Sequence, residues 1–600
     1  MPVITPDKSQ NSYDVIIVGS GAGGGQTAYT LTMDGVKVLM LEAGRFFTAS
    51  ESAMLQLPSH APLRGVRTPD KQYGFHDCSI NSGWDIPGEP YTNADEKSKF
   101  RWWRQRMLGG RTNHWGRKSL RNGPYDFKPR THFDAGFDWP ISYHDVAPYY
   151  DKVEMLVGVF GSNEGIENSP DSSPGVLLPP PKLRVGELYA QKHGKALGWP
   201  IIPTHRAVLT QAQDAENIPA KLHPGNKKAQ RILAQSMRLR APCFWASDCH
   251  RGCAIGANYD SHTVHLKPAL ATGNLDILPN AMAREVTIDK NGKASGITFI
   301  DKTTGKENHV AARVVVLAAS SQESVRLLLN SKSKHFPDGL ANSSGKVGRY
   351  ITDSVSSSFS AHIPAFEGMP LHNEDGAGKA HAYVPWPFHG QKNAKQFDFP
   401  GGFHLEFATG RHMPTMGVAN SFDWLSEQSA YAYGKSFKED ARRYYGCRLG
   451  FGAQGSMMPN EGSFSELDPE VKDQWGIPAL RFHWQWTEHE LNQVKQQQKM
   501  IGELLETMGG KFSSQPKTDP LKAIKPGGAI IHEVGGAIMG DHQNDSVTNQ
   551  WSQTWDVKNL IMADGAPFAS TADKNPTLTI MALAWRAADR LLDEMKKGNL

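Results

Sequence analysis

The sequence has few cysteines, no long apolar run and no excess of either charge, and each absence excludes a class of protein. Five cysteines in 600 residues are too few for a disulfide scaffold, and we expect Cys78 and Cys447, which stand alone, to be buried structural thiols. No stretch approaches the roughly 18 apolar residues of a membrane-spanning helix, so we expect no membrane span in this chain. With 65 basic and 61 acidic side chains, a net charge of +4, nucleic acid is not the expected partner.

The composition is otherwise that of a large globular protein. Hydrophobic residues make up 39% and charged residues 21% of the chain. The N-terminal segment MPVITPDKSQNSYD lacks the basic and apolar regions of a signal peptide. We therefore expect a cytoplasmic protein, or one that is exported together with a partner.

The first 42 residues predict a nucleotide-binding unit. The apolar run Val15–Val18 indicates a buried parallel strand, and the segment after the glycine-rich loop predicts a helix that ends near Met33. A second apolar run, Val36–Leu41, predicts the next strand and is followed by an acid, Glu42. Strand, glycine loop, helix, strand and acid in this order are typical of a dinucleotide-binding βαβ unit.

Each polar or glycine position of this unit has a physical role. Gly19 permits a tight turn, Gly21 lets the backbone approach a pyrophosphate, and Gly24 lets the helix pack closely on the strand. Glu42 can accept hydrogen bonds from a ribose hydroxyl. The pattern leaves NAD and FAD open, and the alternative is a glycine-rich turn in an unrelated α/β domain.

Further along the chain, the apolar patterns predict strands over residues 285–300 and 308–318. They also predict helices over 321–329, over 487–508 behind a Thr487–Glu490 capping box, and over 577–595.

Two other segments place a histidine beside glycines. Leu108–Trp115 contains Gly109, Gly110, Asn113 and His114, and a turn with two glycines lets the backbone approach a flat ring. The alternative for this segment is an ordinary turn with a packed tryptophan.

The second segment contains His532, and it is followed by a short predicted strand that ends in Asp564–Gly565 and by Asn575 before Pro576 and Thr577 at a helix start. A base and an amide donor are what the deprotonation of an alcohol needs. Their spacing alone means little: His532 could be a core histidine, and Asn575 a helix N-cap.

Three cysteines lie within eleven residues, at Cys243, Cys249 and Cys253. This density fits an iron–sulfur cluster. A zinc site would need a fourth ligand, for which His250 is available, and three unligated thiols are the remaining alternative.

The whole pattern resembles the glucose–methanol–choline (GMC) family of FAD-dependent oxidoreductases. The matching segments are Gly19–Glu42, Leu108–Gly116, Trp139–Tyr150, Val315–Leu329, Gly348–Asp353, His532–Gly540 and Leu560–Leu583. The resemblance implies an α/β fold with a Rossmann-like, doubly wound FAD-binding domain and a substrate-binding domain built on an antiparallel sheet with helices. It implies residues 1–50, 95–125, 262–350 and 525–600 for the first, 126–240 and 351–524 for the second, and 241–261 for the cysteine loop.

The resemblance also implies roles for the candidate residues. His532 would take the hydroxyl proton of an alcohol, the hydride would go to flavin N5, and Asn575 would bind the reacting oxygen. His114 would pack against the flavin or be linked to it covalently. The implied FAD contacts are Gly19, Gly21, Gly24, Glu42, Gly109, Gly110, Asn113, His114, Trp115, Val286, Asp564, Gly565, Pro576 and Thr577.

The cysteine loop is similar to that of bacterial FAD-dependent glucose and fructose dehydrogenases, which implies a 3Fe-4S cluster on Cys243, Cys249 and Cys253. It further implies a dehydrogenase of a sugar or glycoside, with C3 of a pyranoside favoured and gluconate, glucose C1 and fructose open. The expected partners are a cytochrome c or quinone acceptor and a small subunit that carries the export signal, so the expected location is the periplasm. The alternatives are an oxygen-using oxidase of the pyranose oxidase type, and a flavin-binding electron carrier or assembly subunit.

Overall fold

The computed structural model describes residues 4–9, 12–46, 82–245, 249, 253–370, 381–389, 396–408, 411, 425, 429–431, 433–512 and 516–600. Its core is a seven-stranded sheet in the order β7-β2-β1-β10-β9-β8, with β17 paired to β10. The bounds are β1 Ser12–Val18, β2 Val38–Leu41, β7 Leu275–Leu278, β8 Ala281–Ile288, β9 Ala294–Asp301, β10 Glu307–Leu317 and β17 Leu560–Met562. The strands β7, β2, β1, β10 and β17 are parallel, whereas β9 and β8 form an antiparallel extension.

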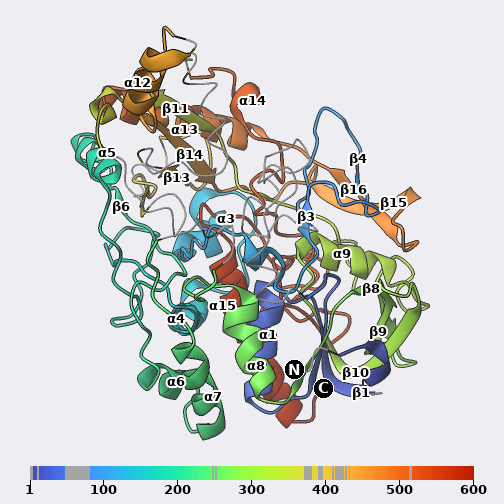
Figure 1. Cartoon of the computed structure of the whole chain (residues 1–600). Coiled ribbons are helices and arrows are strands. Elements are labelled where there is room, and N and C mark those ends of the chain that lie inside the picture. The colour runs from blue at the N-terminus through green and yellow to red at the C-terminus, as the bar shows by residue number, and fades with distance from the viewer. Residues whose placement is uncertain are drawn as a thin grey trace.

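Helices cover both faces of this sheet because successive side chains of a strand point to opposite sides. Val15 and Ile17 of β1 pack in one apolar cluster with α1 (Ala22–Met33) and α15 (Thr577–Lys596). Ile16 and Val18 pack in a second cluster that includes α9 (Ser321–Asn330). The arrangement is the expected doubly wound α/β fold, in which α1, α8 (Lys267–Ala271) and α15 lie together (Figure 1).

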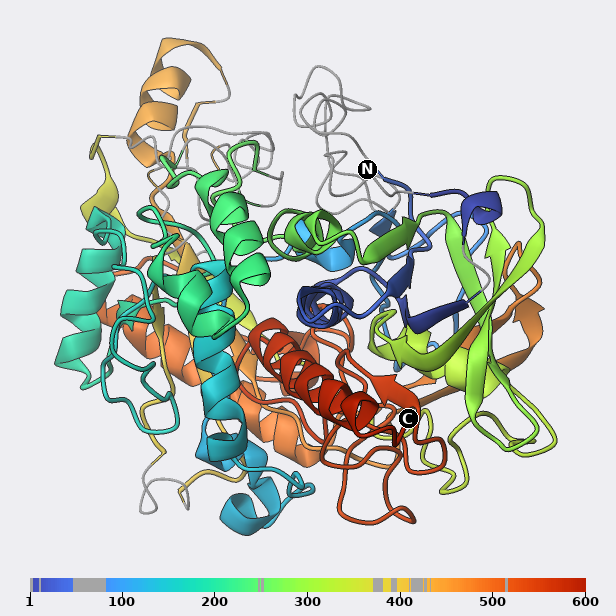
Figure 2. The ribbon, with the colours of Figure 1, turned by 90° about the horizontal axis from the view of Figure 1, so that it is seen from below.

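A second unit is built on a five-stranded antiparallel sheet in the order β11-β14-β13-β12-β6. Its bounds are β6 Ile202–Pro203, β11 Ser358–His362, β12 Ala382–Val384, β13 Phe403–Ala408 and β14 Arg448–Gly455. Helix α13 (Glu488–Thr507) packs its apolar face on this sheet through Ile501, Leu504 and Leu505. Helix α4 (Tyr143–Val157) packs against α15 of the first unit (Figure 2).

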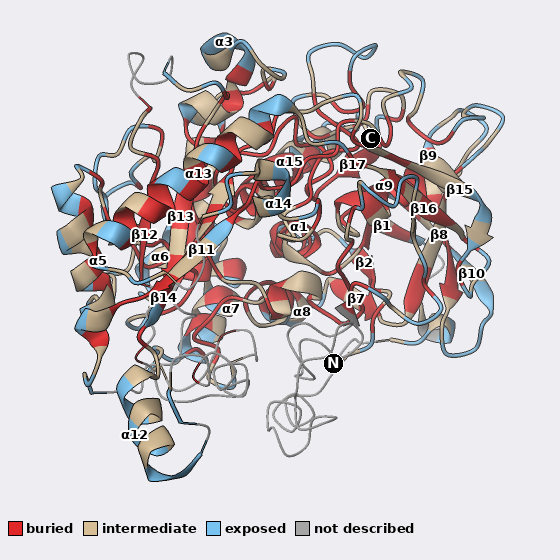
Figure 3. Cartoon of the chain, turned by 90° about the horizontal axis from the view of Figure 1, so that it is seen from above, coloured by how far each residue is buried: buried red, intermediate tan, exposed pale blue. Residues whose placement is uncertain are grey.

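The other elements are shorter and lie around these two sheets. They are β3 Ser82–Gly83, β4 Thr92–Asn93, β5 Arg104–Gln105, α3 Pro129–Phe133, α5 Val185–Ala196, α6 Asn217–Leu222, α7 Lys227–Arg238, α12 Gly434–Tyr444, β15 Phe464–Lys472, β16 Pro478–His483, α14 Pro520–Ala523, a π-helical turn at His262–Leu266 and 3-10 turns at Pro6–Lys8, Gly110–Asn113, Pro124–Phe127 and Pro364–Phe366. Buried residues gather in both sheets and in α1 and α15, whereas α12 has none (Figure 3). Among the described residues, no helix combines the length and the apolar character needed to cross a membrane.

Most of the predicted elements are confirmed, with one correction. The first strand, the helix that ends at Met33, the second strand and the helices over 321–329, 487–508 and 577–595 are all present. The run 285–300, however, is not one strand but the hairpin of β8 and β9. The turn Asp289–Lys293 interrupts it, since the Asp289 carboxylate accepts from the backbone N–H groups of Asn291 and Lys293. The predicted domain boundaries stay a prediction.

Candidate active site

A cavity of about 430 Å³ opens at the carboxyl edge of the parallel strands β1, β2 and β10. Its lining comes from segments far apart in the chain, which lie within residues 18–23, 41–43, 104–118, 281–283, 318–327, 406–407, 530–533 and 564–580, together with residues 206 and 454. The carboxyl edge is where ligands bind in open α/β sheets, because loops diverge there and leave a crevice.

The glycine loop forms one end of this cavity. Gly19 has a φ of +99°, a left-handed conformation that favours glycine, and a Cβ on Gly24 would lie 2.0 Å from the Gly19 carbonyl oxygen. Gly21 caps the N-terminus of α1 and has no atom near its would-be Cβ, so the helix N-terminus stays open to a ligand. The sequence analysis missed Gly23, whose Cβ would lie 1.6 Å from the Ala563 carbonyl oxygen.

Glu42 lies at the end of β2 and lines the cavity. Its Oε2 accepts hydrogen bonds from the Ser20 backbone N–H at 3.2 Å and hydroxyl at 2.5 Å, and its Oε1 accepts from the Gly44 N–H at 2.7 Å. Burial raises the pKa of this carboxyl group, and the Ser20 hydrogen bond opposes the rise. These contacts hold the carboxylate fixed at the position where the sequence predicts a ribose contact.

The turn after Leu108 brings Gly110, His114 and Trp115 to the cavity wall. Gly109 does not line the cavity, and Asn113 lies behind the turn, where its Nδ2 donates to the carbonyl oxygens of Leu108 at 3.0 Å and Gly110 at 2.8 Å. His114 is buried, and its Nδ1 contacts Oε1 of Gln105 at 2.5 Å.

Val286, which the resemblance implies as an FAD contact, lies on β8 three residues after the cavity-lining Ala283. Its side chain is buried in the apolar cluster under α9, and its N–H donates to Ser331 Oγ at 2.8 Å. Val286 does not line the cavity, whereas Ala281, Met282 and Ala283 of the same strand do. The cavity meets only the first three residues of β8, and the rest of the strand continues beneath α9.

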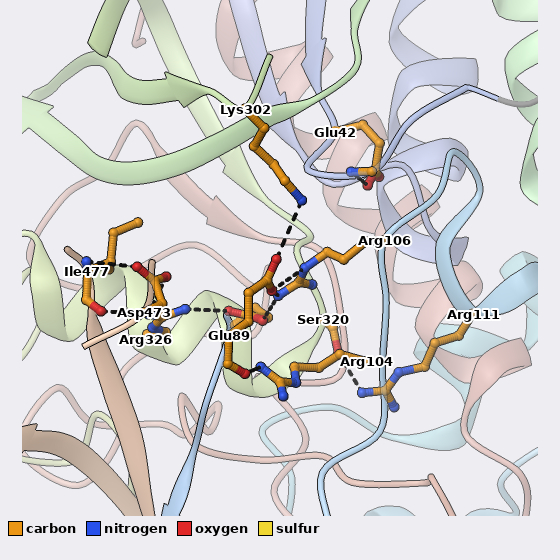
Figure 4. A network of polar contacts seen from close by, with 12 residues as sticks. Glu42, Glu89, Arg104, Arg106, Arg111, Lys302, Ser320, Arg326, Asp473 and Ile477 are labelled. Carbon is orange, nitrogen blue, oxygen red and sulfur yellow. Dashed lines mark hydrogen bonds and ion pairs between the residues drawn. The ribbon is translucent and has the colours of Figure 1, made fainter. Parts of the chain in front are cut away.

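A buried ionic network lies beside the cavity, and the sequence analysis missed it (Figure 4). Arg106 donates to Glu89 at 2.8 Å and pairs with Glu323, and Lys302 approaches Glu89 at 3.4 Å. Arg104 donates to the Glu89 carbonyl oxygen at 2.7 Å. The network crosses four separate chain segments, so only a tertiary structure could bring it together.

The opposite end of the cavity holds the predicted catalytic pair. Asn575 Nδ2 lies 3.4 Å from His532 Nε2, and Ser354 Oγ lies 3.0 Å from His532 Nδ1. The backbone N–H of His532 donates to Asp353 Oδ1 at 3.1 Å, and this bond fixes the backbone of residue 532. Burial lowers the pKa of His532 to about 4, and the charge of Glu406 opposes that shift.

Other residues predicted for the site lie in the same cavity. Asp564, Gly565, Pro576 and Thr577 all line the cavity. Asn575 is not the helix cap, since Pro576 occupies the cap position of α15 and the Asn575 side chain points to His532. Burial raises the pKa of Asp564 to about 6, although a Ser324 hydroxyl at 2.6 Å favours its ionised form.

The three clustered cysteines lie outside this cavity. Cys243 Sγ accepts from the Trp245 N–H at 3.3 Å, and Cys253 Sγ accepts from the Ala257 N–H at 3.2 Å. Burial, together with the nearby thiols of Cys249 and Cys253, raises the pKa of Cys243 to about 11, although the Trp245 N–H opposes the rise. The three thiols are therefore close enough to interact electrostatically.

Within the described part of the chain, no group of three His, Cys, Asp or Glu side chains is placed to hold a metal ion. His250, considered as a fourth ligand, and Cys78 lie outside the described residues. Cys447 is buried and its thiol donates to the Arg443 carbonyl oxygen at 3.3 Å, as expected of a structural thiol.

The donor set of the cavity fits a dinucleotide with a polar ring system. Four buried polar atoms of the cavity wall have no hydrogen-bond partner among the described residues: Arg104 Nε, Arg104 Nη2, Gln105 Nε2 and Asn575 Oδ1. Buried polar atoms that lack a partner are costly, and these belong to residues that line the cavity. The open helix N-terminus at Gly21 adds N–H groups for a pyrophosphate.

Comparisons with known proteins agree with this geometry. Two family models described as GMC oxidoreductase match residues 232–355 and 459–584. The chain is 29% identical to 2-methyl-1,2-propanediol dehydrogenase of Mycolicibacterium austroafricanum, over 97% of this chain and 95% of that protein. It is 26% identical to the fructose dehydrogenase large subunit of Gluconobacter japonicus, over 98% and 99%.

A solved structure shows the same fold. The formate oxidase of Aspergillus oryzae, whose FAD modification that structure addresses, superposes with a TM-score of 0.62 at 15% identity, over 98% of this chain and 100% of that one. The fold, the cavity and the two family models agree with one another. The chain belongs to the GMC oxidoreductase family and is an FAD-dependent oxidoreductase.

Proposed function

We propose that this protein is a dehydrogenase that oxidises a hydroxyl group of a sugar or glycoside to a carbonyl, with C3 of a pyranoside as the favoured position. The observation that carries the proposal is the His532–Asn575 pair in the cavity. The fructose dehydrogenase large subunit and the 2-methyl-1,2-propanediol dehydrogenase, which are similar over nearly the whole chain, support a polyhydroxylated substrate.

His532 acts as the base for the substrate hydroxyl. Since burial lowers its pKa to about 4, its imidazole is neutral near pH 7 and can accept a proton. With Ser354 Oγ accepting from Nδ1–H, the lone pair of Nε2 faces the cavity beside Asn575.

The amide of Asn575 donates to the reacting oxygen, on which negative charge grows as the proton leaves. FAD, when bound, supplies the acceptor for the hydride. Gly110, His114 and Trp115 on the cavity wall would hold its ring system, and the glycine loop with Glu42 its adenosine diphosphate portion.

We further propose that Cys243, Cys249 and Cys253 would hold a 3Fe-4S cluster, which would supply one-electron transfer toward a cytochrome or quinone acceptor. The spacing, the electrostatic proximity of the thiols and the two N–H···S bonds support this assignment. A small subunit with an export signal, and a periplasmic location, belong to the same proposal. The relative's description as a large subunit supports a multi-subunit enzyme.

An oxygen-using oxidase is the second candidate. It is favoured by one observation, namely that the described cysteines do not converge into a metal-holding group. An oxidase passes both electrons to oxygen and needs no cluster.

The flavin itself reports on the dehydrogenase chemistry. Anaerobic mixing with a panel of sugars and glycosides should bleach the flavin absorbance with at least one of them. The His532→Ala variant should keep its flavin but be reduced about 10²- to 10⁴-fold more slowly, as expected for loss of a general base. Full activity in this variant would contradict the assignment of the base.

The cluster is tested by iron analysis and low-temperature EPR of anaerobically purified protein. About three irons per chain, with the signal of an oxidised 3Fe-4S centre, support the dehydrogenase. The Cys249→Ser variant should lose both the iron and the EPR signal. Flavin without iron supports the oxidase. The same preparation, precipitated with acid, shows whether His114 retains the flavin covalently.

A further inference from the structure

A cluster of ionisable side chains at the cavity has no part in the proposed mechanism. It consists of Lys118, His404 and Glu406, two of which, Lys118 and Glu406, line the cavity. Glu406 Oε1 lies 2.8 Å from Lys118 Nζ and 3.2 Å from His404 Nε2. Glu406, His404 and Lys118 all influence the pKa of His532, which indicates that the cluster lies near this histidine.

The cluster is held rigidly by both units of the fold. Glu406 and His404 lie on β13 of the antiparallel sheet, whereas Lys118 follows the turn at His114 and bridges to Arg206. His404 Nδ1 also contacts the carbonyl oxygen of Asp573, two residues before Asn575. The charged groups and the catalytic amide are therefore fixed relative to one another.

Hydrogen-bonding capacity remains in this cluster after its internal contacts are made. Both contacts to Glu406 from the described residues end on Oε1, so Oε2 has no protein donor there. Lys118 Nζ carries three N–H groups, and Glu406 is its one ion-pair partner in the described part of the chain. The Lys118 side chain is 7% exposed and the Glu406 side chain 24%, so water is largely excluded from the ammonium group, whereas the carboxylate stays partly accessible.

We propose that Glu406 and Lys118 bind a second hydroxyl group of the substrate, next to the one that is oxidised, and so select vicinal diols and sugars over monohydric alcohols. A hydroxyl group both donates and accepts, so it can donate to Glu406 Oε2 while it accepts from Lys118 Nζ. A monohydric alcohol leaves both groups unpaired. This inference rests on the proposed oxidation of a hydroxyl group beside His532.

The test compares matched substrates on the complete FAD-containing protein. Anaerobic flavin reduction is measured with methyl glucoside and its 2-deoxy and 4-deoxy analogues, and with propane-1,2-diol and propan-1-ol. The variants are Glu406→Gln, Lys118→Met and the double variant of both, which leaves no uncompensated charge. Glu439→Gln, in an exposed ion pair on α12, is the matched control.

We expect Glu406→Gln and Lys118→Met to lower kcat/KM about 10- to 100-fold for the substrate with the adjacent hydroxyl, as expected for loss of a hydrogen bond to a charged group. They should change the matched deoxy or monohydric substrate much less. The ratio within each pair matters, because the charge of Glu406 also acts on His532 and would slow both substrates equally. The assignment is overturned if the ratio of kcat/KM values within each pair stays unchanged, whether both values fall equally or neither falls.

Failure of the proposed function gives a different result. In that case no alcohol bleaches the flavin of the wild-type protein. Binding of methyl glucoside and its deoxy analogues is then measured by calorimetry, and the assignment stands only if the parent sugar binds more tightly and Glu406→Gln removes that difference.

Discussion

At the scale of single residues, burial tunes the groups of the catalytic end in opposite directions. Burial lowers the pKa of His532 to about 4, because it disfavours the cation. Burial raises the pKa of Asp353, which accepts the His532 backbone N–H, to about 7, with a further rise from Glu533. Both shifts favour the neutral form, because burial removes the water that would solvate a charge.

The depressed pKa of His532 predicts the pH dependence of flavin reduction. A base with a lowered pKa is already deprotonated at neutral pH and loses activity only as the pH falls through that value. We therefore expect the acid limb of kcat/KM to lie near pH 4, well below the pKa of about 6.5 of a free histidine. Stopped-flow reduction between pH 4 and 8 measures it, and a limb near 6.5 would contradict the effect of burial.

At the scale of elements, a buried ionic contact joins helix α4 to the segment after the cavity wall. Arg121, which follows the cavity segment, donates to both carboxylate oxygens of Glu154 at 2.9 and 2.5 Å and to Asp151 at 2.5 Å. The Glu154 side chain has no exposed surface. This contact fixes α4, and through it α15, against the segment that carries His114 and Lys118.

Breaking this contact should destabilise the protein. Arg121→Met leaves the Glu154 carboxylate buried without its partner, which costs about 3–5 kcal/mol. Adding Glu154→Leu should recover much of that loss, because the uncompensated charge is then gone. Chemical denaturation followed by tryptophan fluorescence measures the effect, and Arg130→Met, in an exposed pair with Asp134, is the control that should change little. Equal midpoints for Arg121→Met and the wild type would show that this contact does not hold α4.

At the scale of the whole molecule, the cofactor cavity joins pieces that are distant in sequence. The central sheet takes β1 and β2 from the N-terminus, β7 to β10 from the middle and β17 from the end of the chain. The cavity lining comes from these three regions and also from residues 104–118, 206, 406–407 and 454. A ligand in this cavity therefore contacts all of them at once.

Removal of FAD should consequently lower the stability of the entire chain. A ligand that binds only the folded state, at about 1,000 times its dissociation constant, stabilises it by about 4 kcal/mol. Thermal unfolding of FAD-stripped protein should shift upward on addition of FAD and less with riboflavin, which lacks the pyrophosphate and adenosine. Equal shifts with both would show that the glycine loop and Glu42 contribute nothing to binding.

Local patterns were enough to predict the elements that form the site. The strand–glycine loop–helix unit, the capping box of α13 and the start of α15 depend on contacts within a few residues, so the sequence encodes them directly. For Val286 a local pattern leaves the placement open: it lies three residues beyond the cavity-lining Ala283, and which end of a strand meets a cavity depends on the register of its neighbours. The site roles of the residues that do line the cavity stay predictions until tested.

The sequence by itself determined the doubly wound fold, the glycine loop at the start of α1 and the placing of His532 and Asn575 in one site, as parts of one family pattern. Only the tertiary structure decided which charges meet in the cavity. Lys118 and Glu406 are 288 residues apart, and Arg106 and Glu323 are 217 apart. No local pattern can pair such residues, because the pairing arises when the packing of the two sheets closes the space between them.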